Sequence, residues 1–359
     1  MKNLKDIKAE ARHFNQRDMK KRRKVSWSRL ASPYAQRTLY PGSTRNNFLT
    51  EIGTPKLPGL TFACGDMVAE AKYFKLLKSS RVDAFDISDK AVYRAKEHCK
   101  KLGLNMHFAL RDVNTIKLQE NHYGLVVLNH SYHHLSEIEY LAEQVAKSLL
   151  PEGIFLLLDY IGPRCIQFTP QQLKYANEAL QMIPPSLRKE RLGKVMEMVN
   201  PPLRWGLSAH EAIQSHKILP AIESNFKCIK GLLFGGLMHP VLERIAASFD
   251  PNNIDHAAIL DKLWCMEKEL MENCKIEPNF CELILVRKDS PVFDKYPEIK
   301  FEYRHLEIDK RYEWLIDTSS KEIWRLKKII QQYEEISLKE FSKHYIKKVL
   351  GKLIAPVLK

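Results

Sequence analysis

Short apolar runs alternate with longer helix-compatible stretches from residue 59 onward, and this alternation restricts the fold more than any other feature of the chain. Five runs of four to seven residues fall within about a hundred positions. They are residues 59–63, 81–86, 106–109, 124–129 and 153–159. The stretches that follow the first, second and fourth runs have the length of helices and reach about Leu77, Lys101 and Leu149. This order is typical of βαβ units, which build a parallel sheet.

Two later runs, residues 226–230 and 281–286, predict two more strands, separated by a helix from about Pro240 to Cys274. The expected fold class is therefore α/β, a Rossmann-like sheet of seven strands. About sixty residues between the fifth and sixth strands, 164–225, are rich in helical patterns and prolines. An insert of this size near the carboxyl edge of a sheet usually shapes a substrate pocket.

The pattern changes after Lys288, where apolar residues recur at intervals of seven, three, four and three. These residues are Ile316, Ile323, Leu326, Ile330 and Tyr333. The spacing predicts a long helix that either forms a coiled coil with a partner or a second copy, or lies on its own chain. The expected organisation is a basic segment at 1–45, the sheet domain at 46–290 and a helical extension at 291–359.

Positive charge is concentrated at the two ends of the chain. Of the formal net charge of +14, residues 1–30 carry +8 and residues 339–359 carry +5, so the part between is nearly neutral. Basic segments attract phosphate, whether of nucleic acid, of anionic lipid or of a nucleotide-linked or lipid-linked substrate. A solvated tail without a partner is the alternative at the N-terminus. The C-terminal segment also spaces Phe341, Tyr345 and Val349 helically, which favours a helix lying on an anionic membrane surface.

The seven cysteines include no C-x-x-C pair, which argues against a disulfide framework or a zinc knuckle. The first residues lack the apolar stretch of a signal peptide, and no run of about 18 apolar residues occurs. We therefore expect a cytoplasmic protein, either free or peripheral on the inner face of the cell membrane.

Polar residues follow several strands at the edge where an open parallel sheet binds ligands. The small-residue turn Ala63–Gly65 lets the backbone pass close to a nucleotide-like ligand. Asp86 ends the second strand 21 residues after Gly65, a distance at which an acid accepts hydrogen bonds from both hydroxyls of a ribose. The alternative role for Asp86 is the N-cap of the next helix, for which Ser88 and Asp89 are equally suited.

Asp112 follows the third strand, where an acid and a backbone N–H can read the edge of an adenine, or where the acid is an ordinary turn residue. The fourth strand ends in the run 129–135, N-H-S-Y-H-H-L, whose polar side chains stand at the mouth of the expected cleft. An imidazole that is neutral near pH 7 suits general-base catalysis. The sequence offers no convincing ligand set for a metal.

With these residues in view, the chain resembles the class I S-adenosylmethionine-dependent methyltransferases over about Gly59 to Lys288. The resemblance rests on ACGD, on the acid that closes the second strand, and on RDV, LVVLNHSYHHL and PEGIFLLLDYIGP. The stretches DYIGPRCIQFTPQQL, HEAIQSHKILPAIE and GGLMHPVLERIAASF further resemble a bacterial subgroup often encoded in surface-polysaccharide loci, those for O-antigen and capsule.

The resemblance implies S-adenosylmethionine as cofactor. It maps the cofactor-binding positions to Ala63, Cys64, Gly65, Asp86, Ile87, Asp112, Val113 and Asn129. The family turn is usually G-x-G-x-G after an acid, whereas this chain has Ala63 and Met67 at the first and third glycines and Thr61 at the acid. We expect the bulky Met67 side chain to stand where the amino acid part of the cofactor would lie.

The resemblance also implies an enzyme, most simply one that O-methylates a sugar of a surface glycan or a related small molecule. A sugar hydroxyl is a poor nucleophile, so a base is needed, and the first candidates are His133 and His134. Asp159 at the end of the fifth strand would orient one of them. Further residues expected to contact the acceptor are Tyr132, Tyr160, Arg164 and His239. The alternatives are a nucleic-acid methyltransferase, which the placement of the basic residues favours less, and a non-catalytic scaffold at the membrane.

Overall fold

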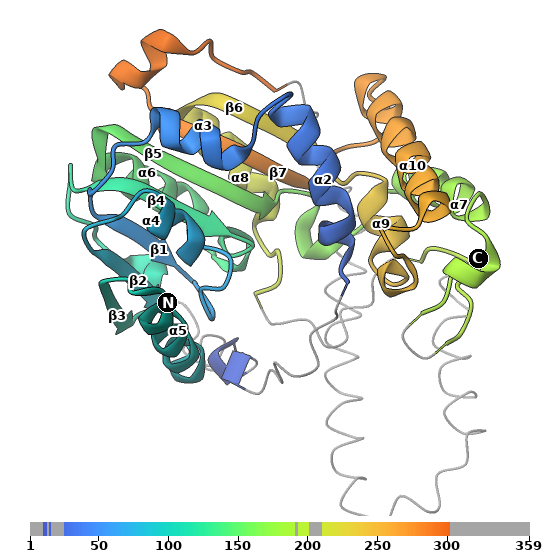
Figure 1. The fold of residues 1–359 in the computed structure, drawn as a ribbon, viewed down its shortest axis with the longest axis horizontal. Coiled ribbons are helices and arrows are strands. Elements are labelled where there is room, and N and C mark those ends of the chain that lie inside the picture. Colours follow the sequence, from blue (N-terminus) through green and yellow to red (C-terminus); the bar gives the residue numbers. More distant parts are fainter. Residues whose placement is uncertain (1–9, 13, 16–24, 191–192, 201–209, 302–359) are drawn as a thin grey trace, which may run out of the picture. The chain divides into compact units, whose positions relative to one another are not determined.

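The computed structural model describes residues 10–12, 14–15, 25–190, 193–200 and 210–301, and these contain a single seven-stranded sheet (Figure 1). The strands are β1 (Gly59–Phe62), β2 (Val82–Asp86), β3 (Met106–Leu110), β4 (Tyr123–Asn129), β5 (Leu149–Tyr160), β6 (Phe226–Phe234) and β7 (Phe280–Arg287). Each of the seven predicted strands is present, so the expected α/β Rossmann-like fold class is confirmed.

The strand order is β3-β2-β1-β4-β5-β7-β6. Strands β1 to β5 run parallel, whereas β7 pairs antiparallel with both β5 and β6. The order reverses between β1 and β4, and an open α/β sheet binds its ligand outside the carboxyl ends of the strands at such a switch point. The fold therefore directs attention to the loops after β1, β2 and β4.

Nine α-helices of at least five residues accompany the sheet within the described residues (Figure 1). They are α2 (Trp27–Leu39), α3 (Arg45–Ile52), α4 (Ala71–Leu76), α5 (Asp89–Leu102), α6 (Ile138–Ser148), α7 (Pro170–Gln181), α8 (Ile218–Asn225), α9 (Met238–Leu242) and α10 (Ile254–Glu272). Residues of α6 and α8 pack in one apolar cluster with the sheet, and residues of α3, α4 and α5 pack in another. A third cluster joins α2 to α7, α9 and α10 beside the end of the sheet.

One expectation about a helix was wrong. The helix expected from Pro240 to Cys274 is interrupted between α9 and α10. Asp250 precedes Pro251, a position that disfavours helical backbone, and the Asn253 side chain then caps α10 by accepting from the N–H groups of Asp255 and His256. The basic N-terminal segment also contains α2, whose buried residues include Trp27, so its end belongs to the packed domain.

Residues 291–301 likewise pack on the sheet domain. The Ile299 N–H donates to the carbonyl oxygen of Cys228, and the Tyr296 hydroxyl donates to Glu51. The heptad pattern and the basic C-terminal helix lie outside the described residues and stay predictions. Among the described helices, none is both long and apolar enough to cross a membrane. All seven cysteines are described and are free thiols.

Candidate functional site

The turn after β1 holds three alternate residues in the left-handed backbone region. Their φ angles are 48° at Ala63, 53° at Gly65 and 59° at Met67. These are the three positions where the resembled family has glycine, so the backbone keeps that shape although two of the residues carry a Cβ. A left-handed conformation costs an L-residue roughly 1–2 kcal/mol, and the surrounding structure supplies that energy here.

Met67 does not occupy the cavity, and the expectation that its side chain would do so was wrong. The side chain is fully buried and packs in the apolar cluster that contains Ala71 and Phe74. It is not among the residues that line the cavity. Exchange of glycine for methionine therefore leaves the space above the turn open.

Asp86 is held in place by two backbone groups. Its Oδ2 accepts from the Gly65 N–H at 2.9 Å, and its Oδ1 accepts from the Ser88 N–H at 2.8 Å. The Ser88 side chain accepts from the N–H of Ala91 and is the N-cap of α5, so the capping role that competed for Asp86 belongs to Ser88. Burial raises the pKa of Asp86, while the two N–H groups favour its ionised form.

Asp112 caps the turn that follows β3 and also faces the cavity. Its Oδ1 accepts from the N–H and the side-chain amide of Asn114, which caps a short 3₁₀ turn. It also lines the cavity. The cofactor-side assignment of Asp112 thus stays a prediction that the capping bonds do not exclude.

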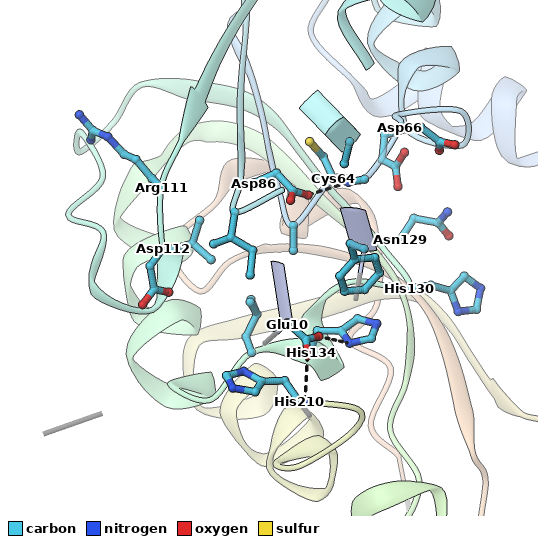
Figure 2. A pocket seen from close by; sticks show the side chains of 18 of the residues that line it. Glu10, Cys64, Asp66, Asp86, Arg111, Asp112, Asn129, His130, His134 and His210 are labelled. Atoms are coloured by element: carbon cyan, nitrogen blue, oxygen red, sulfur yellow. Dashed lines mark hydrogen bonds and ion pairs between the residues drawn. The ribbon is translucent and has the colours of Figure 1, made fainter. Parts of the chain in front are cut away.

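One cavity of about 300 Å³ lies at these strand ends (Figure 2). All eight residues predicted to bind cofactor line it, from Ala63 after β1 to Asn129 at the end of β4. Glu70 also lines it, and burial raises the pKa of this carboxyl to about 7. Glu70 was missed because it lies inside a turn-helix segment with no motif, and only its burial beside Asn129 reveals it.

Asp159, at the end of β5, organises the loop that follows β4. This fully buried carboxylate accepts through Oδ2 from the N–H groups of Ser131 and Tyr132, at 3.0 and 2.7 Å. Its Oδ1 lies 2.5 Å from Nδ1 of His133. Although burial opposes ionisation, the charge of His133 and these donors hold the pKa of Asp159 below its usual value. The pairing of Asp159 with a loop histidine thus agrees with the expected orienting role.

His133 is engaged on both ring nitrogens. Nδ1 faces Asp159, and Nε2 lies 3.2 Å from Oε1 of Glu211, a residue of the insert. Burial opposes its charge, but the two carboxylates raise the pKa of His133 to about 10. At neutral pH the ring in this arrangement is an imidazolium, which has no lone pair to accept a proton. The structure therefore contradicts a general-base role for His133 as it stands here.

His130 is the imidazole that the sequence analysis left without a role. It lines the cavity, its ring lies near that of Phe280 with centroids 5.7 Å apart, and its backbone N–H donates to the carbonyl oxygen of Leu158 at 2.7 Å. Its φ of 52° places it in the left-handed region, which is uncommon for a residue with a Cβ and is often found at functional sites. Loss of hydration lowers the pKa of His130, so the ring is neutral near pH 7.

The far wall of the cavity comes from distant parts of the chain. His134 lines it, and its Nδ1 lies 3.5 Å from Oε1 of Glu10 in the N-terminal segment. Oε2 of Glu10 accepts from the N–H of His210 in the insert, as the dashed lines of Figure 2 show. The Phe14 ring meets the His134 ring edge-on at 5.4 Å between centroids. The N-terminal segment and the insert thus meet at His134.

The structure does not bring the expected acceptor contacts to this cavity. The hydroxyl of Tyr132 donates to the carbonyl oxygen of Ile138, and that of Tyr160 donates to the carbonyl oxygen of Pro163; both side chains are buried. These two phenols are bonded inside the protein and stabilise the loops.

His239 and Arg164 lie outside the cavity lining as well. His239 is buried against Trp27 and Phe280, and burial lowers its pKa to about 3. Arg164 is half-buried. Neither residue is placed to reach an acceptor through this cavity.

Comparison with known proteins identifies the central part of the sheet domain. Residues 60–153 match the family model described as a methyltransferase domain. No curated protein sequence matches the chain.

Solved structures with a similar course of the chain include methyltransferases and one enzyme of another class. An S-adenosylmethionine-dependent methyltransferase from Mesorhizobium loti is 17% identical, with a TM-score of 0.39 over 72% of this chain and 98% of that one. One from Aquifex aeolicus is 22% identical, with a TM-score of 0.29 over 40% and 77%. The [4+2]-cyclase SpnF is 12% identical, with a TM-score of 0.39 over 76% and 85%.

The residues at the strand ends fit the cofactor that a methyltransferase domain of this fold uses, S-adenosylmethionine. Asp86 presents a fixed carboxylate toward the cavity for hydroxyl groups. A Cβ added at Gly65 would meet nothing within 4 Å, so space is open above the turn. Residues 60–153 thus match a methyltransferase domain, and the residues at its strand ends would hold S-adenosylmethionine.

Proposed function

We propose that this S-adenosylmethionine-dependent methyltransferase methylates a hydroxyl oxygen of a sugar, in a bacterial surface glycan or a related small molecule. The observation that carries the proposal is that one cavity is lined both by the cofactor-side residues and by His130 and His134. The resemblance of residues 159–173 and 210–223 to enzymes of surface-polysaccharide loci supports the choice of a glycan.

The chain's own residues have two tasks in such a reaction. The bound cofactor supplies an electrophilic methyl group on a sulfonium. The protein must hold the acceptor oxygen close to that carbon in line with the departing sulfur, and such positioning supplies roughly 7–11 kcal/mol of the barrier in favourable cases. It must also remove the proton of the hydroxyl, because a neutral sugar hydroxyl is a weak nucleophile.

We assign the proton transfer to His130 in place of His133. His130 is neutral near pH 7, reaches the cavity and follows β4 directly. Its Nδ1 or Nε2 can therefore accept the acceptor proton without first losing one. His134, the other candidate from the sequence, also lines the cavity and lies beside Glu10.

Transfer of labelled methyl groups to nucleotide-linked or lipid-linked sugars tests the proposal. Since general-base catalysis contributes roughly 10²–10⁴-fold, His130→Gln should lower kcat by about that factor and leave cofactor affinity unchanged. His122→Gln is the matched control, because His122 lies directly before β4, at the opposite end of the same strand. Equal kcat values for the two variants would remove His130 as the base. If methyl groups were transferred to another class of acceptor and to no sugar, a glycan would be excluded as the substrate.

The basic ends support a site of action beside an anionic membrane, where lipid-linked glycans are displayed. If so, the full chain should pellet with vesicles that contain anionic lipid, and less so as salt concentration rises. Deletion of the residues after Ser337 should abolish the pelleting. Equal pelleting with neutral vesicles would contradict this location.

A further inference from the structure

We propose that His133, His134 and Glu211 form a binding site for one first-row divalent cation at the wall of the cofactor cavity. Each of the three offers one ligand atom, and these atoms all lie within 4.8 Å of one another. Imidazole nitrogen and carboxylate oxygen together suit zinc and its neighbours in the first transition row. The proposal does not depend on which acceptor the enzyme methylates.

The distance between the ligand atoms of His133 and Glu211 is that expected for two ligands of one ion. Nε2 of His133 and Oε1 of Glu211 are 3.2 Å apart. Two ligands that each lie about 2.0–2.1 Å from a tetrahedral zinc ion are about 3.3 Å from one another. The widest of the three separations is at most 4.8 Å, so side-chain rotation has to bring those two ligand atoms closer by up to about 1.5 Å. The rings of His133 and His134 already lie with centroids 4.2 Å apart.

The surroundings of His133 are those of a metal ligand. A histidine that binds metal through one ring nitrogen usually donates from the other nitrogen to a carboxylate, which fixes the tautomer and the ring orientation. Nδ1 of His133 faces Asp159 at 2.5 Å, so Nε2 is the nitrogen that remains to face Glu211. Asp159 itself is anchored by the N–H groups of Ser131 and Tyr132.

The charge around the cluster favours a cation. Three carboxylates, those of Glu10, Asp159 and Glu211, lie against the two imidazoles. Oε1 of Glu10 is 3.5 Å from Nδ1 of His134 and can supply a fourth oxygen or hold His134 in place. A divalent ion would balance this concentration of negative charge in place of the ring proton: binding releases the Nε2 proton of His133, and Nε2 then offers its lone pair to the ion.

The position of the cluster at the cavity would allow a bound ion to take part in the reaction. His134 lines the cavity beside Glu10, as Figure 2 shows, so an ion bound to it would lie at the wall of the cavity that Asp86 also lines. A Lewis acid there lowers the pKa of a coordinated acceptor hydroxyl. In that role, which depends on the proposed function, the hydroxyl proton passes to His130, the oxygen takes the methyl group and the sulfur leaves as a neutral thioether.

The spacing of residues in the sequence does not predict these three ligands. His133 and Glu211 are 78 residues apart in the chain, and no pattern around Glu211 indicates a metal ligand. Only the packing of the insert against the loop after β4 brings them together.

Equilibrium dialysis of the purified full-length chain tests the site, with Zn²⁺ as the probe. After removal of metal with a chelator, the wild-type chain should bind one tightly held Zn²⁺. His134→Ala and Glu211→Gln should each weaken that binding at least tenfold, a typical cost of disturbing a metal site. His107→Gln is the matched control, because exposed His107 also pairs with an aspartate, Asp83, at 2.9 Å. It should bind as wild type does.

Wild-type affinity in both site variants, or no retention of Zn²⁺ by the wild-type chain, would overturn the proposal. Circular dichroism confirms that each variant is folded. X-ray absorption of the zinc-loaded wild-type chain provides a second readout, with nitrogen and oxygen expected at about 2.0–2.1 Å. Sulfur at about 2.3 Å would assign the ion to exposed thiols such as Cys265 and Cys274 and contradict the site. Because no readout is enzymatic, its failure is distinguishable from failure of the proposed reaction.

Discussion

The two halves of the cavity are built in different ways. On the side of β1, β2 and β3, the predicted cofactor-binding residues lie at the strand ends or just after them, and Asp86 is fixed by the neighbouring N–H groups of Gly65 and Ser88. On the side of β4 and β5, the loop histidines are fixed by partners from distant segments, namely Asp159, Glu211 and Glu10. The first half is held by backbone hydrogen bonds and the second by charged side chains.

This difference has an energetic consequence. The cofactor side should tolerate the loss of a single carboxylate, because the turns are closed by main-chain groups. The acceptor side should not, because a buried charge without its partner is far more costly than a lost surface contact.

The largest effect is expected for Asp159→Ala. The substitution leaves the His133 ring buried without its main partner. It also removes the acceptor of the N–H groups of Ser131, Tyr132 and His133. The free energy of unfolding should fall by about 3–5 kcal/mol, the usual cost of breaking a buried pair. Urea denaturation measures this. Asp86→Ala should cost clearly less, and an equal loss in the two variants would contradict the contrast.

The cost of Asp159→Ala should also depend on pH. Because the pKa of His133 is raised in the folded state, its protonated ring adds to the free energy of unfolding. This contribution is complete below about pH 6.5 and is lost as pH rises toward about 10. The lowered pKa of Asp159 contributes above about pH 3.9 and is lost in acid. The difference between wild type and variant should therefore be largest between about pH 4 and 6.5. A difference that grew from pH 7 to 9 would contradict the pairing.

Asp86→Ala should instead act on the cofactor. Removal of an acceptor for ribose hydroxyls is expected to weaken binding of S-adenosylmethionine by about 1–3 kcal/mol, roughly five- to a hundredfold. Isothermal calorimetry measures the change. Asp89→Ala is the control, because Asp89 is exposed in the first turn of α5 and should bind as wild type does. Unchanged affinity in the Asp86 variant would remove that residue from the cofactor site.

The same contrast explains which parts could be predicted from the sequence. The seven strands and the cofactor side follow from local patterns, since Gly65, Asp86 and Asn129 each stand where a strand ends. Glu211 and Glu10 could not be found in this way, because only tertiary packing places them beside His133 and His134. The prediction for Met67 was wrong because it considered only the size of the side chain. The backbone at Met67 is left-handed, and the side chain is buried in the core and not in the cavity.

Glu70 offers a smaller effect on the cofactor side. Since its pKa is raised to about 7, the carboxyl is largely protonated at pH 5.5 and ionised at pH 8. An ionised Glu70 attracts the cationic sulfonium, so affinity for S-adenosylmethionine should rise roughly tenfold over that range. The demethylated product, which has no sulfonium charge, should show less change. Glu70→Gln should bind with no such pH dependence; a persisting tenfold rise would assign it to another group.

The smallest effect is expected for Ala63→Gly. Glycine relieves the left-handed strain at φ 48° but gains freedom in the unfolded chain, so stability should rise by only about 0.5–1 kcal/mol. Thermal unfolding with and without cofactor measures this change. A loss of stability would show that the Ala63 methyl group packs usefully and that the turn is not strained there.

Calorimetric titration of the wild-type chain with S-adenosylmethionine tests the central claim most directly. The account predicts one binding site per chain, filled by S-adenosylmethionine and by its demethylated product, at the ends of β1 to β4. A chain that binds neither compound at millimolar concentration would contradict it.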